Sequence, residues 1–523
     1  MRHLSLALPA LALSALMLYD AAAQSVDSQR GYASIRVEDL QKHLAVLSSD
    51  SLEGRETATD GQRRASAYIA SVFHSLGLTP AGDEGSYFQN FDVAIRSVDP
   101  RSSILVSRST ERATLVWGQD FLASTSAPQS QEGPLVFIGY LDAPLDSIQR
   151  LSLQNAFVLA FAGKRSDAQE SYSSRVRRRF FRQFPGSLGT IVIVDEKEGE
   201  TFEALTSSLR GTLERGSMSL PDEMEPQRGA RPPVFFISMG SATRVLQSTG
   251  KDASAWRLRA LSDDPLGPVT VGNTTMAVDL ALQTRTATTQ NVVALIKGKH
   301  PTLRDQFVVL SAHYDHLGRS QDGEIFHGAD DDGSGTAMLL ELAEAYTLNP
   351  TRPDRSILFV AMTGEEKGLL GSEYYVSHPV RPLDRSIANL NIDMIGRIDE
   401  RHAAMTSGRY VYVIGSDKIS TELDSLLQHV NQTTVRLDLD YTYNDERDPN
   451  QFYRRSDHYN FARHGIPVVF FFSGIHEDYH RVTDTIDKIR FDKMVPIGQL
   501  IYQTGWELSG RAQPLEKRHP VAP

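Results

Sequence analysis

Cysteine is absent from all 523 residues of the chain. Disulfide bonds and thiolate metal ligands are therefore excluded, and any metal site must be built from histidine and carboxylate side chains. Structural zinc sites in proteins rely mainly on cysteine, so a site of this composition favours a catalytic ion. Stability must come from hydrophobic cores and, where present, from bound metal.

Long basic runs are also missing, and the net charge is −11. An acidic chain of this kind is a poor candidate for nucleic-acid binding, so no nucleic-acid partner is expected. Residues 175–182 hold the one basic cluster, in which arginines are interleaved with Phe180 and Phe181. A patch for nucleic acid or an anionic surface stays an alternative there, but the pattern favours a solvated helix face with two buried aromatic rings.

The N-terminus carries the pattern of a secretory signal. Arg2 precedes the apolar stretch Leu4–Leu18, and Ala21–Ala23 offers a small-residue cleavage site before Gln24. About 15 apolar residues are too few for a membrane span, which needs roughly 20, although an uncleaved anchor stays an alternative. We therefore expect a signal peptide over residues 1–23 and an exported protein, periplasmic or extracellular, with no membrane contact after cleavage.

Hydrophobic periodicity divides the rest of the chain into parts. Apolar residues at helical spacing predict helices over Val37–Leu47 and Gly61–Leu76, in an N-terminal helical part spanning 24–95. Short β-rich runs separated by irregular polar loops predict a β-rich accessory domain, inserted over 96–285. These runs are Pro134–Tyr140, Ala156–Ala162, Thr190–Val194 and Pro233–Ser238.

From residue 286 to 510, strands and helices alternate. This order predicts an α/β domain around a central mixed, mostly parallel sheet. The proline-rich segment 511–523 is expected to be a flexible tail. The strands are expected at Asn291–Lys297, Phe307–Ala312, Ser356–Met362, Ile387–Ile392, Tyr410–Ile414 and Ile466–Phe472, and the helices at Ser334–Tyr346, Leu369–Ser377, Ser420–Asn431 and Lys493–Leu508.

Five side chains of metal-binding type stand just after predicted strands or in the loops that follow them. Parallel strands bring their carboxyl ends to one edge of a sheet, so these side chains should converge. Two imidazoles and three carboxylates can hold two zinc ions if one carboxylate bridges them. Singly, each has a structural alternative, such as a helix cap or, for residues 330–332, a calcium loop. The five are His313, Asp331, Glu366, Asp393 and His480.

Two neighbours of these residues add to the predicted chemistry. Glu365 directly precedes Glu366, and consecutive side chains can point to different places. One glutamate can therefore bind metal while the other takes a proton from water. Asp315, two residues after His313, is placed to orient that imidazole.

The sequence segments around these residues resemble the secreted di-zinc aminopeptidase family, with its leucyl aminopeptidase and glutamate-carboxypeptidase-like members. The motif resemblance covers about residues 286–490, and weaker similarity reaches back to residue 35. It implies a three-layer α/β/α zinc-exopeptidase domain, and residues 96–285 resemble the protease-associated domain often inserted in this family. The segments are Ser311–Asp315, Gly328–Gly335, Thr363–Glu366, Asn391–Met394 and Tyr479–His480.

By position, the resemblance implies a role for each of the five candidate ligands. His313 and Asp393 would bind one Zn²⁺, and Glu366 and His480 the other. Asp331 would bridge the two ions, because family members place the bridging acid third after the glycine of this loop. The resemblance thus implies two Zn²⁺ per chain.

Further roles follow from the same resemblance. Glu365 would be the general base, and Tyr479 stands where some members place a tyrosine that stabilises the oxyanion. Asp457 and His458 belong to a segment that lies near the family's active site. They would support the ligands or face the substrate, with an ordinary hydrogen-bonded loop as the alternative.

The sequence predicts an exported zinc aminopeptidase that removes N-terminal residues from peptides with a free amine. A carboxypeptidase, a dipeptidase or an amide deacylase on the same scaffold is the alternative. Arg397, Arg454 and Arg455 could hold a terminal carboxylate, which keeps the carboxypeptidase open. A glutaminyl-cyclase-like enzyme is disfavoured by His313, and a non-catalytic receptor or binding protein is the remote alternative. Oligomeric state has no signal in the sequence.

Overall fold

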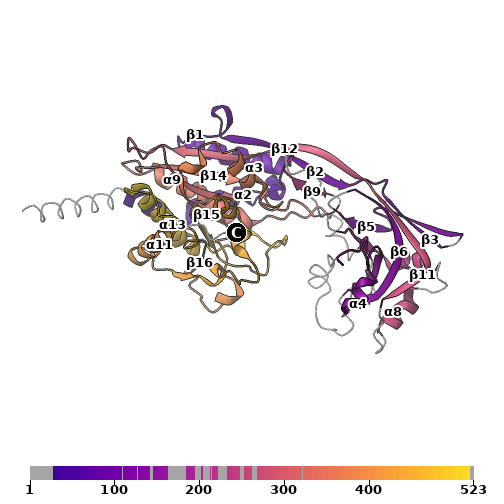
Figure 1. Cartoon of the computed structure of the whole chain (residues 1–523). Helices are drawn as coiled ribbons and strands as arrows, with labels where there is room; N and C mark the ends of the chain where they lie inside the picture. The colour runs from indigo at the N-terminus through magenta and orange to yellow at the C-terminus, as the bar shows by residue number, and fades with distance from the viewer. Residues whose placement is uncertain are drawn as a thin grey trace, which may run out of the picture. The chain divides into compact units, whose positions relative to one another are not determined.

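The computed structural model divides the chain into two compact units (Figure 1). One unit contains the chain up to Asp92 and from Thr288 onward, and the other is Val93–Ala287. The predicted signal peptide and the basic cluster at 175–182 lie outside the described residues. The structure describes residues 28–108, 110–125, 128–141, 145–162, 184–194, 202–203, 213, 215–221, 232–247, 253–261, 268–320 and 322–518.

The described residues form a ten-stranded mixed sheet with the order β17-β16-β18-β15-β13-β14-β12-β2-β9, and β1 pairs with β12. Its strands belong to the first unit, except β9 and the parts of β2 and β12 that fall within Val93–Ala287. The four strands β18, β15, β13 and β14 are mutually parallel, whereas β16 and β12 flank them antiparallel. The bounds are β1 Thr79–Pro80, β2 Phe88–Val98, β9 Ser217–Ser219, β12 Leu282–Ile296, β13 Phe307–His313, β14 Ser356–Met362, β15 Ser386–Ile392, β16 Tyr410–Ile414, β17 Asp438–Asp440 and β18 Val468–Phe472.

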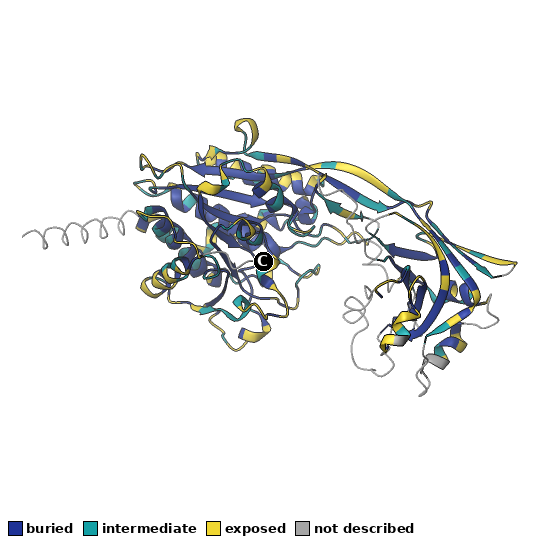
Figure 2. Ribbon diagram, in the orientation of Figure 1, coloured by how far each residue is buried: buried dark blue, intermediate teal, exposed yellow. Residues whose placement is uncertain are grey.

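Helices cover both faces of this sheet, because its parallel strands are apolar on both sides. Val308 and Leu310 of β13 face one core, and Val309 faces the other. Figure 2 shows the strands of this unit buried along most of their length. On the first face lie α2 Val37–Leu47, α3 Asp60–Ser75, α9 Gly335–Thr347, α11 Thr421–Thr433 and α13 Phe491–Gly510, and on the second lie α10 Leu370–Ser377 and α12 His458–Arg463.

An eight-stranded sheet organises the second unit, with the order β4-β3-β11-β6-β7-β8-β10-β5. Its two faces also carry separate cores, and Trp256 packs on Phe137 with ring centroids 4.7 Å apart. The elements are β3 Ser103–Arg108, β4 Glu111–Val116, β5 Phe121–Ser124, β6 Gln129–Tyr140, β7 Phe157–Phe161, β8 Gly189–Ile193, β10 Val234–Ile237, β11 Val269–Leu280, α4 Ser147–Leu151, α7 Met239–Gln247 and α8 Ala253–Leu261.

The mixed α/β class and the individual elements predicted for 286–510 are confirmed, with ends displaced by a few residues except in β12, which begins at Leu282 and not at Asn291. Two expectations need correction. The part at 24–95 is not wholly helical, because β2 begins at Phe88. The segment from 511 is not a flexible tail over residues 511–518: Leu515 is buried in the first unit's core, and the Arg518 amide donates to the Ile419 carbonyl.

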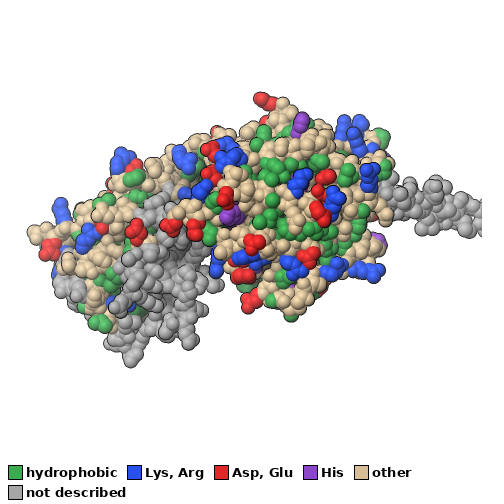
Figure 3. All heavy atoms as spheres, turned by 180° about the vertical axis from the view of Figure 1, so that it is seen from behind, with side chains coloured by type: hydrophobic (Ala, Val, Ile, Leu, Met, Phe, Trp, Pro, Cys, Tyr) green, Lys and Arg blue, Asp and Glu red, His purple; other side chains and the backbone are tan. Residues whose placement is uncertain are grey.

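Two features of the molecule concern its contacts, namely the charges on its surface and the hydrophobicity of its helices. On the face shown in Figure 3, lysine and arginine side chains are interspersed with aspartate and glutamate. Among the described residues, no helix has both the length and the apolar character that crossing a bilayer requires.

Candidate metal centre and pocket

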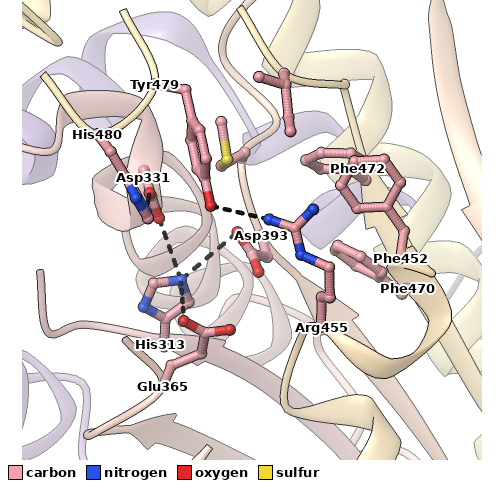
Figure 4. A pocket seen from close by; sticks show the side chains of 12 residues that line it. His313, Asp331, Glu365, Asp393, Phe452, Arg455, Phe470, Phe472, Tyr479 and His480 are labelled. Carbon is pink, nitrogen blue, oxygen red and sulfur yellow. Dashed lines mark hydrogen bonds and ion pairs between the residues drawn. The ribbon is translucent and has the colours of Figure 1, made fainter. Parts of the chain in front are cut away.

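The candidate ligands lie at the carboxyl ends of the parallel strands, as predicted. His313 is the last residue of β13, and Asp393 directly follows β15. Asp331 lies in the π-helical turn Ala329–Ser334, which leads into α9. Glu365 and Glu366 follow β14, and His480 lies in the loop after β18. Figure 4 shows His313, Asp331, Glu365, Asp393 and His480 around a single pocket.

Asp331 stands between the two candidate histidine ligands. Its Oδ1 lies 3.4 Å from His313 Nε2, and its Oδ2 lies 3.1 Å from His480 Nε2. Burial alone would raise the pKa of Asp331, but hydrogen bonds with these two imidazoles hold that pKa well below its usual range. A carboxylate whose two oxygens face different donor groups has the geometry of a bridging ligand.

Each histidine has a second carboxylate beside it. His313 Nε2 lies 3.5 Å from Asp393 Oδ1, and His480 Nε2 lies 3.1 Å from Glu366 Oε2. Donors bound to one ion at about 2.0–2.2 Å are about 3.3–3.6 Å apart at tetrahedral angles. The structure thus brings together all five predicted ligands in two groups that share Asp331, at separations that suit metal ions.

His316 is a neighbour of this centre that sequence reasoning missed. It is fully buried, and its Nδ1 lies 2.9 Å from Glu366 Oε1. It forms a possible metal-binding group with Asp331 and Glu366. The only sequence signal is a second imidazole three residues after His313. Asp332 lies near His313 and Asp393, although its Oδ1 already accepts two backbone amides.

Glu365 borders the two groups without joining either. Its Oε2 lies 4.0 Å from His313 Nε2, and its side chain lines the pocket (Figure 4). Burial, together with the nearby carboxylates of Asp393 and Glu366, raises the pKa of Glu365 well above its usual range. A carboxyl group with a raised pKa binds a proton more readily than an ordinary glutamate does, and this one lies beside the candidate ligands.

A comparison with protein families matches residues 291–505 to peptidase family M28. This part of the chain belongs to family M28. Aminopeptidase YwaD of Bacillus subtilis (strain 168) is 31% identical over 237 residues, which are 42% of this chain and 45% of that protein. The match thus spans less than half of this curated relative's own length.

Two solved structures share the fold of the chain. The aminopeptidase from Aneurinibacillus sp. strain AM-1 superposes with a TM-score of 0.53 and 18% identity, covering 95% of this chain and 98% of that one. A zinc aminopeptidase from Bacillus subtilis gives a TM-score of 0.50 and 20% identity, covering 92% and 98%.

Asp315 supports the M28 site in a way that differs from the prediction. His313 Nδ1 lies 3.2 Å from the Asp315 carbonyl oxygen but 3.7 Å from its carboxylate. The carboxylate instead accepts the Thr57 hydroxyl at 2.7 Å and the Glu365 amide at 3.2 Å. The backbone of Asp315 therefore meets the imidazole, and its side chain holds the loop of Glu365.

The two other predicted residues lie behind the ligands. Asp457 and His458 are fully buried, and neither is among the pocket-lining residues. Burial raises the pKa of Asp457 to about 7 and lowers that of His458 to about 3, so the imidazole is neutral. The His458 ring stacks on Phe470, which itself lines the pocket, with ring centroids 4.7 Å apart.

One wall of the M28 pocket is lined by apolar side chains, and the charged side chain of Arg455 lies beside them. Arg455 lies over the Phe452 ring and donates from Nη2 to the Tyr479 hydroxyl at 3.3 Å. Tyr479 stacks on His480 with centroids 3.8 Å apart, and burial raises the pKa of the phenol, which keeps it protonated. The apolar lining residues are Met394, Phe452, Phe470, Phe472 and Ile475.

Proposed function

We propose that this chain is an aminopeptidase with two Zn²⁺ ions in its M28 domain. The observation that carries the proposal is Asp331, whose two oxygens face His313 and His480 while Glu365 stands free beside them. The donor set fits zinc, since imidazole and carboxylate groups without cysteine form the usual catalytic zinc sites. His313 and Asp393 would hold one ion, and Glu366 and His480 the other.

The residues around the ligands have separate tasks in this proposal. Bound zinc supplies a Lewis acid and a water of lowered pKa. Glu365 accepts the proton of the attacking water and returns it to the leaving amine. The Tyr479 hydroxyl, held by Arg455, donates a hydrogen bond to the oxyanion.

The pocket suggests which peptides this site takes. We propose that the wall of Phe452, Phe470 and Phe472 receives an apolar first side chain, because aromatic rings offer large apolar contact area. The free amine of the peptide would lie among the carboxylates, which balance its positive charge. The relative YwaD is named as an aminopeptidase, which agrees with this direction.

A carboxypeptidase or dipeptidase is the second candidate, because Arg455 brings a cation to the pocket. Guanidinium groups bind carboxylates through paired hydrogen bonds. The other predicted cations suit this role less well. Arg397 is buried and pairs with Asp478 at 2.9 Å, and Arg454 is not among the pocket-lining residues.

A panel of aminoacyl anilides tests the proposal, run beside the same panel with blocked amines. We expect cleavage of free-amine substrates only, with apolar residues preferred, loss of activity with a chelator and return of activity with zinc. About two ions per chain are expected at this centre. Cleavage of blocked or carboxyl-terminal substrates alone would favour the second candidate, and cleavage that survives complete metal removal would contradict the zinc mechanism.

The Ser456 hydroxyl gives a separate prediction about metal affinity. It is buried and donates to Asp393 Oδ2 at 2.6 Å. Ser456→Ala should weaken metal binding about 10–100-fold, because the ligand carboxylate loses the group that orients it. Competition with a calibrated chelator measures the change. Ser71→Ala is the control, since Ser71 is exposed and bonds only its own helix. Equal affinities of the two variants would contradict the role.

We also propose that the protein is exported and that its units have distinct tasks. The sequence of residues 1–23 supports a signal peptide. The helices on both faces of the first sheet support the three-layer α/β/α arrangement of zinc exopeptidases. The unit Val93–Ala287 would be the inserted protease-associated-like domain, and its bounds lie close to the predicted 96–285.

A further inference from the structure

A second group of metal-binding side chains lies outside the pocket, between α2 and α9. His43 comes from α2, and Glu341 and Glu344 lie one turn apart on α9. One donor atom from each residue lies within 4.8 Å of the others. Donors on one tetrahedral ion are about 3.3–3.6 Å apart, so the three side chains would have to close by about 1 Å around a bound ion.

Glu341 brings an unsatisfied oxygen to this group. The residue is 1% exposed, and its Oε1 accepts the Arg36 amide at 3.2 Å. Its Oε2 is buried and has no hydrogen-bond partner among the described residues. A buried carboxylate oxygen without a partner costs free energy, and a bound cation would remove that cost.

The histidine is fixed and neutral. His43 is 4% exposed, and its Nδ1 lies 2.8 Å from the Tyr68 hydroxyl. Burial lowers the pKa of His43 to about 4, so the ring carries no charge at neutral pH. If Nδ1 donates its proton to Tyr68, Nε2 presents a lone pair, which is the form of imidazole that binds metal.

Charged side chains of both signs lie near the group: Asp39 and Glu344 on the negative side, and Arg36 and Lys42 on the positive side. Burial raises the pKa of Glu341 to about 8, and Asp39 and Glu344 add to this rise, although the Arg36 amide opposes it. The guanidinium of Arg36 also opposes this rise, although it pairs with Asp39 at 2.6 Å. A carboxyl group with this pKa is mostly protonated at neutral pH, so a divalent cation between the helices would bind by displacing the proton of Glu341.

We propose that His43, Glu341 and Glu344 form a third metal site, for a divalent ion of the zinc class. One imidazole and two carboxylates suit Zn²⁺. Most structural zinc sites use cysteine, but this group lies outside the pocket, so its ion would act on the two helices and not on a substrate. The ion would fasten α2 to α9. Because α9 begins directly after the turn that holds Asp331, the same ion would stiffen one side of the M28 site.

The test compares zinc content in four forms of the full-length protein at one buffered free Zn²⁺ concentration. They are the wild type, His43→Ala, Glu341→Gln and the control Glu38→Gln, which removes an exposed charge from the same helix. Elemental analysis should find about one ion fewer per chain in the two cluster variants than in the wild type and the control. Hydrolysis of an anilide substrate should continue in all four, since the cluster lies outside the pocket.

Two further measurements keep the outcome decisive. Circular dichroism identifies a variant that fails to fold, and Glu341→Gln preserves the shape of the side chain if His43→Ala does fail. Anomalous scattering at the zinc edge should give a peak between α2 and α9 in wild-type crystals grown with zinc. Equal zinc content in all four proteins, or a missing peak in the wild type, would overturn the third site. A water molecule would then be the hydrogen-bond partner of Glu341 Oε2.

Discussion

Replacing Glu365 by glutamine is expected to lower kcat by about 10²–10⁴-fold, the usual contribution of a general base. The substitution keeps the shape of the side chain but removes its ability to accept a proton. Because Glu365 Oε2 lies 4.0 Å from His313 Nε2 and joins neither ligand group, the zinc content should stay unchanged. Steady-state kinetics and elemental analysis of the same preparation measure both quantities.

The adjacent glutamate provides a matched contrast. Glu366 Oε2 lies 3.1 Å from His480 Nε2, so Glu366→Gln should lose metal as well as activity. A drop in zinc content in Glu365→Gln would make Glu365 a ligand and remove it from the role of base. Undiminished kcat with full zinc content would mean that another group accepts the proton.

Arg55→Met is expected to destabilise the first unit by about 3–5 kcal/mol, because it leaves several buried carbonyl oxygens without a donor, at about 1–3 kcal/mol each before relaxation. Arg55 is fully buried, and its guanidinium donates to four backbone carbonyl oxygens. Loss of the side chain leaves these four carbonyl oxygens buried without a hydrogen-bond donor. The acceptors belong to Leu47, Tyr314, His327 and Gly328.

The same arginine connects both loops that flank the metal centre. Tyr314 directly follows His313, and Gly328 precedes the turn of Asp331. Arg55→Met should therefore lower metal affinity together with stability. The measurement is denaturant unfolding at fixed zinc, followed by a signal from the M28 domain, because two units need not unfold in one step.

Arg64→Met is the matched control for Arg55. Arg64 is exposed and pairs with Glu53, so its loss should change stability by less than about 1 kcal/mol. Arg55→Lys separates charge from geometry, because an ammonium group cannot reach acceptors in four directions as a guanidinium does. If the Arg55→Met protein were as stable as the Arg64→Met protein, the role of Arg55 in holding these loops together would be contradicted.

Buried strands and the residues that follow them were predictable from the sequence. A continuous apolar run such as Phe307–Ala312 has few alternatives in a parallel sheet, and sheet topology then fixes where His313 and Asp393 must lie. This is why the convergence of ligands from five separate segments could be expected without a structure.

Residues that depend on loop geometry were not predictable. His316 reaches Glu366 only because the chain turns back after β13, and no periodicity encodes such a turn. The sequence gives no indication that Arg55 is buried, since an arginine in a polar loop is usually exposed. The long strand β12 was predicted only from Asn291 onward, because residues 283–286 are exposed and lack the alternation that marks a half-buried strand.

The chain passes between the two units along neighbouring strands. β2 and β12 stand side by side in the sheet order, and Thr288 Oγ1 donates to Asp92 Oδ1 at 2.7 Å where the division falls. The chain thus leaves the first unit along β2 and returns to it along β12, and these two strands are hydrogen-bonded neighbours in one β-ribbon. A gene that joined residue 92 to residue 288 through a two-residue turn would close this ribbon as an ordinary hairpin. The unit Val93–Ala287 is therefore attached in the manner of a cassette, which a single deletion or replacement could exchange without altering the order of any strand that carries a ligand.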